Sequence, residues 1–193
     1  MPRLRRPLAV LLALLASGGL AACGNHPDEN ARVVRAETEG LYLDVGDLKY
    51  QVQVSRQLNP RDIQDRSYLV GIPAGQQTLK PDEVWFGVFM RIQNETSHAH
   101  QPASNIEIVD TQDNTFRPIG IDPSANPFAY DPNAFVPADD TLPLRDTPAF
   151  DSPTRGQLML FKITLTSLAN RPLELHFDSR SGRTQTGIVD LDV

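Results

Sequence analysis

The sequence predicts an all-β protein: an antiparallel β-sandwich of about eight strands with two long loops, preceded by a helical signal peptide. Three observations lead to this prediction. Apolar and polar residues alternate with a period of two over most of the chain after residue 40. Turn-forming residues separate these runs. No window after residue 40 shows the apolar repeat of a helix that packs on a core.

The first 22 residues have the composition of a secretory signal peptide. Arg3, Arg5 and Arg6 make the start basic, and a mostly apolar run of thirteen residues follows from Leu8 to Leu20. A helix that crosses a bilayer needs about 20 apolar residues. This run is too short for that and matches the apolar region of a signal peptide.

The small residues Ala21 and Ala22 end the apolar run, and Cys23 follows them directly. The string Leu20-Ala21-Ala22-Cys23 resembles the lipobox of bacterial lipoproteins. The resemblance implies cleavage before Cys23, lipidation of its sulfur and acylation of the new amino terminus. Two or more acyl chains hold a protein firmly on a bilayer, so we expect a protein anchored to the cell membrane on its extracytoplasmic face. The alternative is an ordinary signal peptide with an incidental cysteine.

Composition limits what the rest of the chain can do. The chain has 18 Lys+Arg and 24 Asp+Glu, and removal of the three arginines before residue 23 leaves 15 bases against 24 acids. An acidic surface repels phosphate backbones, so we expect no nucleic-acid partner. The single cysteine excludes an internal disulfide and a Cys-rich zinc site. Residues 23–39 are polar and predict a lipidated tether, and residues 40–193 suit one domain.

The predicted strands follow one another along the domain, and most have one apolar and one polar face. Their ranges are 41–45, 50–54, 84–92, 106–108 with a return at 116–119, 159–165, 173–177 and 189–193. In the 50–54 run, Tyr50, Val52 and Val54 share the apolar face. The 84–92 run is apolar on both faces over its first half, which predicts a central strand whose Trp85 and Phe89 a loop covers.

Two connections, 56–83 and 120–156, are too long for simple turns. The second has seven prolines, which exclude it from a central sheet, and it carries Phe128, Tyr130 and Phe135. These aromatic side chains fit two roles. They could form a surface that binds a protein partner, or the loop could wrap the sandwich and cover its core, which is the favoured reading.

Several runs and turns together carry a family resemblance. They are Gly46 to Val54, Val84 to Ile92 with Asn94 after it, Val109 to Phe116, Gly156 to Ile163, and Pro172 to Phe177. Over residues 40–193 this pattern resembles the immunoglobulin-like extracellular domains of bacterial lipoproteins, which are related to secreted immunoprotective antigens. The resemblance implies an immunoglobulin-type sandwich with no cofactor and no catalytic residues.

The strongest candidate for a metal site is the His98-Ala-His100 pair. Imidazole and thioether groups suit copper, and Met90 and Met159 are the thioethers within the predicted strands. Both methionines fall on the inward face, where Met is ordinary packing. His98 and His100 therefore remain as two ligands, which make a weak site.

The sequence contains none of the catalytic motifs typical of hydrolases, and no acidic pair has the spacing of a calcium loop. Asp110 and Asp113 fit better as turn formers. We therefore expect no enzyme, but an interaction or envelope accessory module with a protein partner in the cell envelope. The alternative is an extracytoplasmic carrier of copper or of a small ligand. Titration with copper separates the two.

Overall fold

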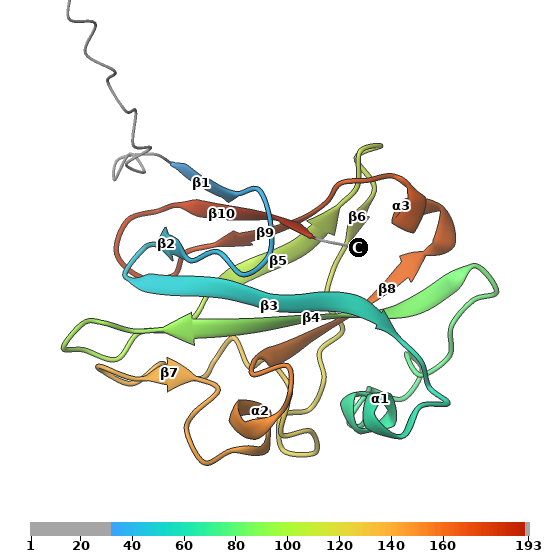
Figure 1. Ribbon diagram of the computed structural model, residues 1–193, viewed down its shortest axis with the longest axis horizontal. Coiled ribbons are helices and arrows are strands. Elements are labelled where there is room, and N and C mark those ends of the chain that lie inside the picture. Colours follow the sequence, from blue (N-terminus) through green and yellow to red (C-terminus); the bar gives the residue numbers. More distant parts are fainter. Residues whose placement is uncertain (1–31, 192–193) are drawn as a thin grey trace, which may run out of the picture.

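The computed structural model describes residues 32–191, which form two β-sheets packed face to face (Figure 1). The predicted signal peptide and Cys23 lie outside these residues. The prediction of an all-β sandwich is confirmed. The described residues hold ten strands, and the strands that the alternation did not predict are short: β1 has four residues and β7 has two.

The first sheet contains five strands. In spatial order they are β1 (Val33–Ala36), β10 (Thr186–Leu191), β9 (Leu173–Asp178), β5 (Ser104–Val109) and β6 (Thr115–Phe116). All neighbours are antiparallel except β1 and β10, which run parallel with Val33 opposite Thr186. Because β1 pairs with the sheet and Ala36 is buried, the folded domain begins before residue 40, where the sequence predicted its start.

The second sheet is built around one long central strand. Its strands are β2 (Leu43–Val45), β3 (Leu48–Leu58), β4 (Glu83–Gln93), β7 (Thr141–Leu142) and β8 (Gln157–Thr164). β4 pairs with β3 along one edge and with β8 and then β7 along the other. The prediction that the 84–92 run forms a central strand is therefore confirmed.

Three short helices connect strands of the described chain. They are α1 (Ile63–Tyr68), α2 (Pro148–Asp151) and α3 (Leu165–Ala169). The side chains of Asp62, Thr147 and Thr164 accept hydrogen bonds from the first backbone N–H groups of these helices. Helices of four to six residues are too short to produce an apolar repeat, so the capping residues were the available signal. The strand that was predicted to end at Leu165 ends at Thr164, because Thr164 caps α3.

A β-bulge in β3 corrects the predicted alternation. The pairing of β3 with β4 shifts register between Val52 and Val54, and an extra residue in one strand exchanges its two faces. Val52 therefore lies in the core between the sheets, whereas Val54 packs on the outer face of the second sheet. Ser55, expected on the polar face, is buried at 4% exposure.

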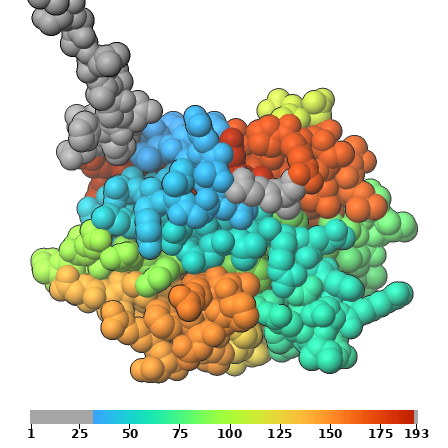
Figure 2. Space-filling model, in the orientation of Figure 1, coloured from blue at the N-terminus to red at the C-terminus, as the bar shows by residue number. Residues whose placement is uncertain are grey.

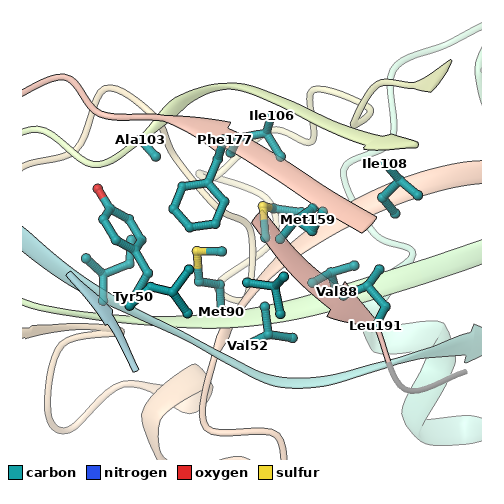
Figure 3. Packing of buried hydrophobic residues seen from close by; sticks show 14 of the residues in the cluster. Tyr50, Val52, Val88, Met90, Ala103, Ile106, Ile108, Met159, Phe177 and Leu191 are labelled. Atoms are coloured by element: carbon teal, nitrogen blue, oxygen red, sulfur yellow. The ribbon is translucent and has the colours of Figure 1, made fainter. Parts of the chain in front are cut away.

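The main core fills the space between the sheets. Figure 3 shows Tyr50, Met90 and Met159 of the second sheet, with Phe177 of the first sheet across this space. Tyr50 and Phe177 are in ring contact, with centroids 4.9 Å apart. Met90 and Met159 are buried here, as the strand pattern predicted, so their sulfur atoms are packing groups.

A second apolar cluster covers the outer face of the second sheet. Trp85 and Phe89 of β4 lie in it, and Tyr68 of α1 contacts both Phe89 and Phe128 with ring centroids 4.9 Å apart. In Figure 2 the segments around residues 60–80 and 140–156 lie side by side below β3. The two long connections thus cover an apolar sheet face, as the central-strand pattern predicted for Trp85 and Phe89.

The long connection also protects a sheet edge. On the side of β8 away from β4, Ile119 N–H donates to the Leu160 carbonyl over 2.7 Å, and Tyr130 N–H donates to the Leu158 carbonyl over 2.9 Å. An uncovered edge of this length would offer a template for another strand. The proline-rich loop is therefore part of the fold and closes the sheet.

Candidate functional site

Four connecting segments meet at one end of the sandwich. They are the β2–β3 turn at 46–47, the β4–β5 loop at 94–103, the segment 130–137 and the β9–β10 loop at 179–185, and we call them the loop end. The backbone N–H of Gly46 donates to the Gln185 side chain over 2.9 Å. Arg180 donates from Nη1 to the Pro132 carbonyl over 2.7 Å. His98, His100, Tyr130 and Phe135, four of the predicted site residues, belong to this end.

Asn94 fixes two of these segments to each other. Its side chain is 1% exposed, and its Nδ2 donates to the carbonyls of His98, Val136 and Pro137 over 2.7, 3.1 and 2.9 Å. Its Oδ1 accepts from the backbone N–H of Thr96 over 2.9 Å. A buried amide that is satisfied in this way holds both loops in one conformation.

His100 is bound into the loop end on both sides of its ring. Its Nε2 lies 2.9 Å from Thr96 Oγ1, and its Nδ1 lies 3.7 Å from Asp47 Oδ2. Its backbone exchanges two hydrogen bonds with Val136, over 3.1 and 2.8 Å. His98 is exposed, and its Nδ1 lies 3.0 Å from Ser97 Oγ. Within residues 32–191 no three His, Cys, Asp or Glu side chains are grouped so as to hold a metal ion.

The structure separates the three aromatic residues predicted for partner binding. Phe128 packs on the second cluster against Tyr68. Tyr130 packs on the main core and donates from its hydroxyl to the Ala103 carbonyl over 2.7 Å, and burial raises the pKa of Tyr130 well above its ordinary value. Phe135 is 58% exposed. The predicted three-residue surface is thereby reduced to Phe135, because the other two side chains cover the cores.

Sequence reasoning missed an open polar depression on the outer side of β3. Arg56 lines it and forms a paired contact with Asp65 of α1, whose Oδ2 accepts from Arg56 Nη1 over 3.1 Å and from the Asn59 N–H over 2.7 Å. Gln53, Gln57, Gln64 and Thr154 are among the other lining residues. The bulge in β3 brings Arg56 to this face, and nothing in the alternation of the sequence indicates a bulge.

The Arg56–Asp65 pair is a structural ion pair. Burial acts to raise the pKa of Asp65, but the hydrogen bonds from Arg56 and from the Asn59 backbone outweigh it and hold this pKa below the ordinary value. Both carboxylate oxygens are engaged. The pair therefore fixes α1 against β3, and its carboxylate is not poised to take up a proton at neutral pH.

Asp110 anchors a turn at the opposite end of the sandwich, as predicted. Its Oδ1 accepts from the backbone N–H groups of Gln112 and Asn114 over 2.8 and 3.0 Å. Its Oδ2 accepts from the Asn114 and Asn170 side chains over 2.9 and 3.1 Å. Asn170 follows α3, so Asp110 joins the β5–β6 turn to the end of that helix.

The described residues define a two-sheet, all-β sandwich protein. No family model matches the chain, and no curated protein matches it. Among residues 32–191 no helix is both long and apolar enough to cross a bilayer.

Solved structures with a similar arrangement share about a tenth of their residues with the chain. The yjhA protein of Bacillus subtilis is 10% identical, with a TM-score of 0.47 over 81% of this chain and 100% of that one. An uncharacterized β-sandwich protein of Clostridium difficile 630 is 10% identical, with a TM-score of 0.46 over 81% and 94%. A proposed lipoprotein of Bacillus subtilis, ycdA, is 11% identical, with a TM-score of 0.46 over 80% and 39%.

Proposed function

We propose that the chain is an extracytoplasmic lipoprotein, anchored through lipid on Cys23, whose β-sandwich serves as an interaction or envelope accessory module without catalysis. The observation that carries the proposal is the order of features at the amino terminus. A basic start and a short apolar run lead through Leu20-Ala21-Ala22 to Cys23. The folded domain begins about ten residues later, at β1.

The arrangement of the domain supports an interaction role. Buried polar side chains, Asn94 and Asp110, fix the loops at the two ends of the sandwich. Loops held on a rigid sheet scaffold keep their surfaces preformed for a partner. A preformed loop surface loses less conformational entropy when it binds than a mobile one does.

The anchor is tested by Cys23→Ser in the host that makes the protein. The serine hydroxyl does not replace the thiol that carries the lipid, so the variant is expected in the soluble fraction or unprocessed in the membrane. Fractionation and an immunoblot for the mature and precursor sizes measure both outcomes. A Cys23→Ser protein that is cleaved normally and sediments with membranes like the parent would contradict the anchor.

The interaction role is tested against the carrier role by calorimetric titration with copper. We expect no micromolar copper binding that depends on His98 and His100, because the imidazole of His100 lies between Thr96 and Asp47 and the methionines of β4 and β8 are in the core. Micromolar binding that disappears in a His98→Ala, His100→Ala double variant would replace the interaction role with a metal carrier.

A further inference from the structure

The chain enters the sandwich at the loop end. β1 runs parallel to β10, so its first residue, Val33, lies beside the first residue of β10, Thr186. The Thr186 N–H donates to the Arg32 carbonyl over 2.8 Å. Thr186 directly follows the β9–β10 loop, and Figure 1 shows the start of β1 on the same side as this loop and as the β4–β5 loop.

Phe135 lies at this same end, and contacts connect it to the entry point. Arg180 of the β9–β10 loop binds the carbonyl of Pro132, three residues before Phe135. Val136, the next residue, pairs with His100 through two backbone hydrogen bonds and accepts from Asn94 Nδ2. Phe135 is thus a projecting apolar side chain, 58% exposed, on a segment that the neighbouring loops hold in place.

The length of chain before β1 limits how far this end can lie from the anchor. Residues 24–32 separate Cys23 from Val33, and nine residues span at most about 30 Å when fully extended. The opposite end lies a full strand away, since β4 alone has eleven residues, or roughly 35 Å. The entry point therefore stays within about 30 Å of the anchor, and Phe135 lies at the same end of the domain, whereas the opposite end can lie much farther away.

We propose that Phe135 contacts the lipid surface to which the chain is anchored, so that the loop end faces the bilayer and the opposite end faces outward. This inference rests on the lipid anchor proposed above. An apolar side chain at the headgroup boundary leaves water and adds to the attachment that the acyl chains provide. The segments of the loop end carry charges of both signs, among them Arg180, Asp47 and Asp131, so we expect an apolar contact that does not require anionic lipid.

The test places a tryptophan at each end of the lipidated full-length protein. Phe135→Trp probes the loop end, and Leu165→Trp, whose side chain is 53% exposed at the start of α3, is the matched control at the opposite end. The native Trp85 is 4% exposed in the second cluster. The parent protein therefore measures the emission of Trp85 alone, which is subtracted from that of each variant. The vesicles consist of phosphatidylcholine, with and without brominated phosphatidylcholine, which quenches tryptophan on contact.

We expect the emission of Phe135→Trp to shift to the blue on vesicles and to be lost with brominated lipid, whereas Leu165→Trp and the parent stay unchanged. Equal quenching of both variants, or quenching of neither, would overturn the inference while leaving the anchor intact, provided that the proteins float with the vesicles. Proteins that do not float with the vesicles would overturn the anchor as well, so the two failures are distinguishable.

Discussion

Asp110 shows how a single carboxylate organises the end of the sandwich opposite the loop end. Burial acts to raise its pKa, but hydrogen bonds from Asn114, Asn170 and Ser167 outweigh burial and hold the pKa well below its ordinary value. A carboxyl group whose pKa is lower in the folded than in the unfolded state stabilises the fold above its unfolded pKa of about 3.9. That stabilisation is lost as the pH falls from there towards the folded pKa.

Asp110→Asn is therefore expected to lower the free energy of unfolding at pH 7 by about 2 kcal/mol, because an amide group would face the amide donors of Asn114 and Asn170. The difference from the parent should shrink as the pH falls below about 4, because the unfolded parent chain then takes up a proton on Asp110 that the folded chain does not. Urea denaturation at several pH values measures it. Asp113→Asn, at an exposed position of the same turn, is the control. A difference that stays constant down to pH 2 would refute the assignment.

At the residue scale, the sequence predicted which side chains bind their local backbone, but not which side chains join distant segments. Asp110 was predicted as a turn former because short polar side chains bind local backbone, and this is a local property. Asn94 was seen only as the residue after a strand. Its role depends on carbonyls of Val136 and Pro137, more than forty residues away, and no local pattern encodes such a contact. The Arg56–Asp65 pair spans only nine residues, but it depends on the bulge that turns Arg56 to the outer face, which the alternation does not indicate.

At the scale of elements, the close contact between β9 and β10 explains why β10 has a glycine at position 187. Gly187 lies opposite Phe177 of β9, and a Cβ atom built on it would lie 2.4 Å from the Phe177 ring. Phe177 is fully buried and in ring contact with Tyr50. The ring therefore occupies the space that a side chain at position 187 would need.

Gly187→Ala is expected to lower the free energy of unfolding by roughly 1–3 kcal/mol, because a buried aromatic ring must move. The melting temperature should fall by several degrees, which a thermal scan by circular dichroism measures. Gly120→Ala is the matched control, since nothing lies within 4 Å of a Cβ atom at Gly120. If the two variants melt together, Phe177 does not occupy this space.

The strands could be predicted where one face is buried and the other is exposed to solvent. β4, β8 and β9 follow from the alternation, and the double-sided apolar character of β4 predicted its central place. The bulge in β3 could not be predicted, because Val54 is apolar and suits either the main core or the second cluster. β1 was missed because four residues are too few to establish a period.

At the scale of the molecule, the long proline-rich connection has a structural role. It covers Trp85 and Phe89, closes the edge of β8 and leaves Phe135 exposed at the loop end. Its composition predicted that it lies outside the sheets and that its aromatics cover something. Which aromatic stays exposed depends on the path of the loop across the sheet, and the spacing of the prolines does not determine that path.

The central claim is that a lipid on Cys23 holds this sandwich at the outer face of a membrane, and intact mass spectrometry of the protein extracted from the membranes of its host tests it most directly. The account predicts a mature chain that begins at Cys23 and carries the mass of a diacylglyceryl group on its sulfur, with a further acyl group on its amino terminus where the host adds one. A mature chain with an unmodified Cys23, or with residues 1–22 still attached, would contradict it.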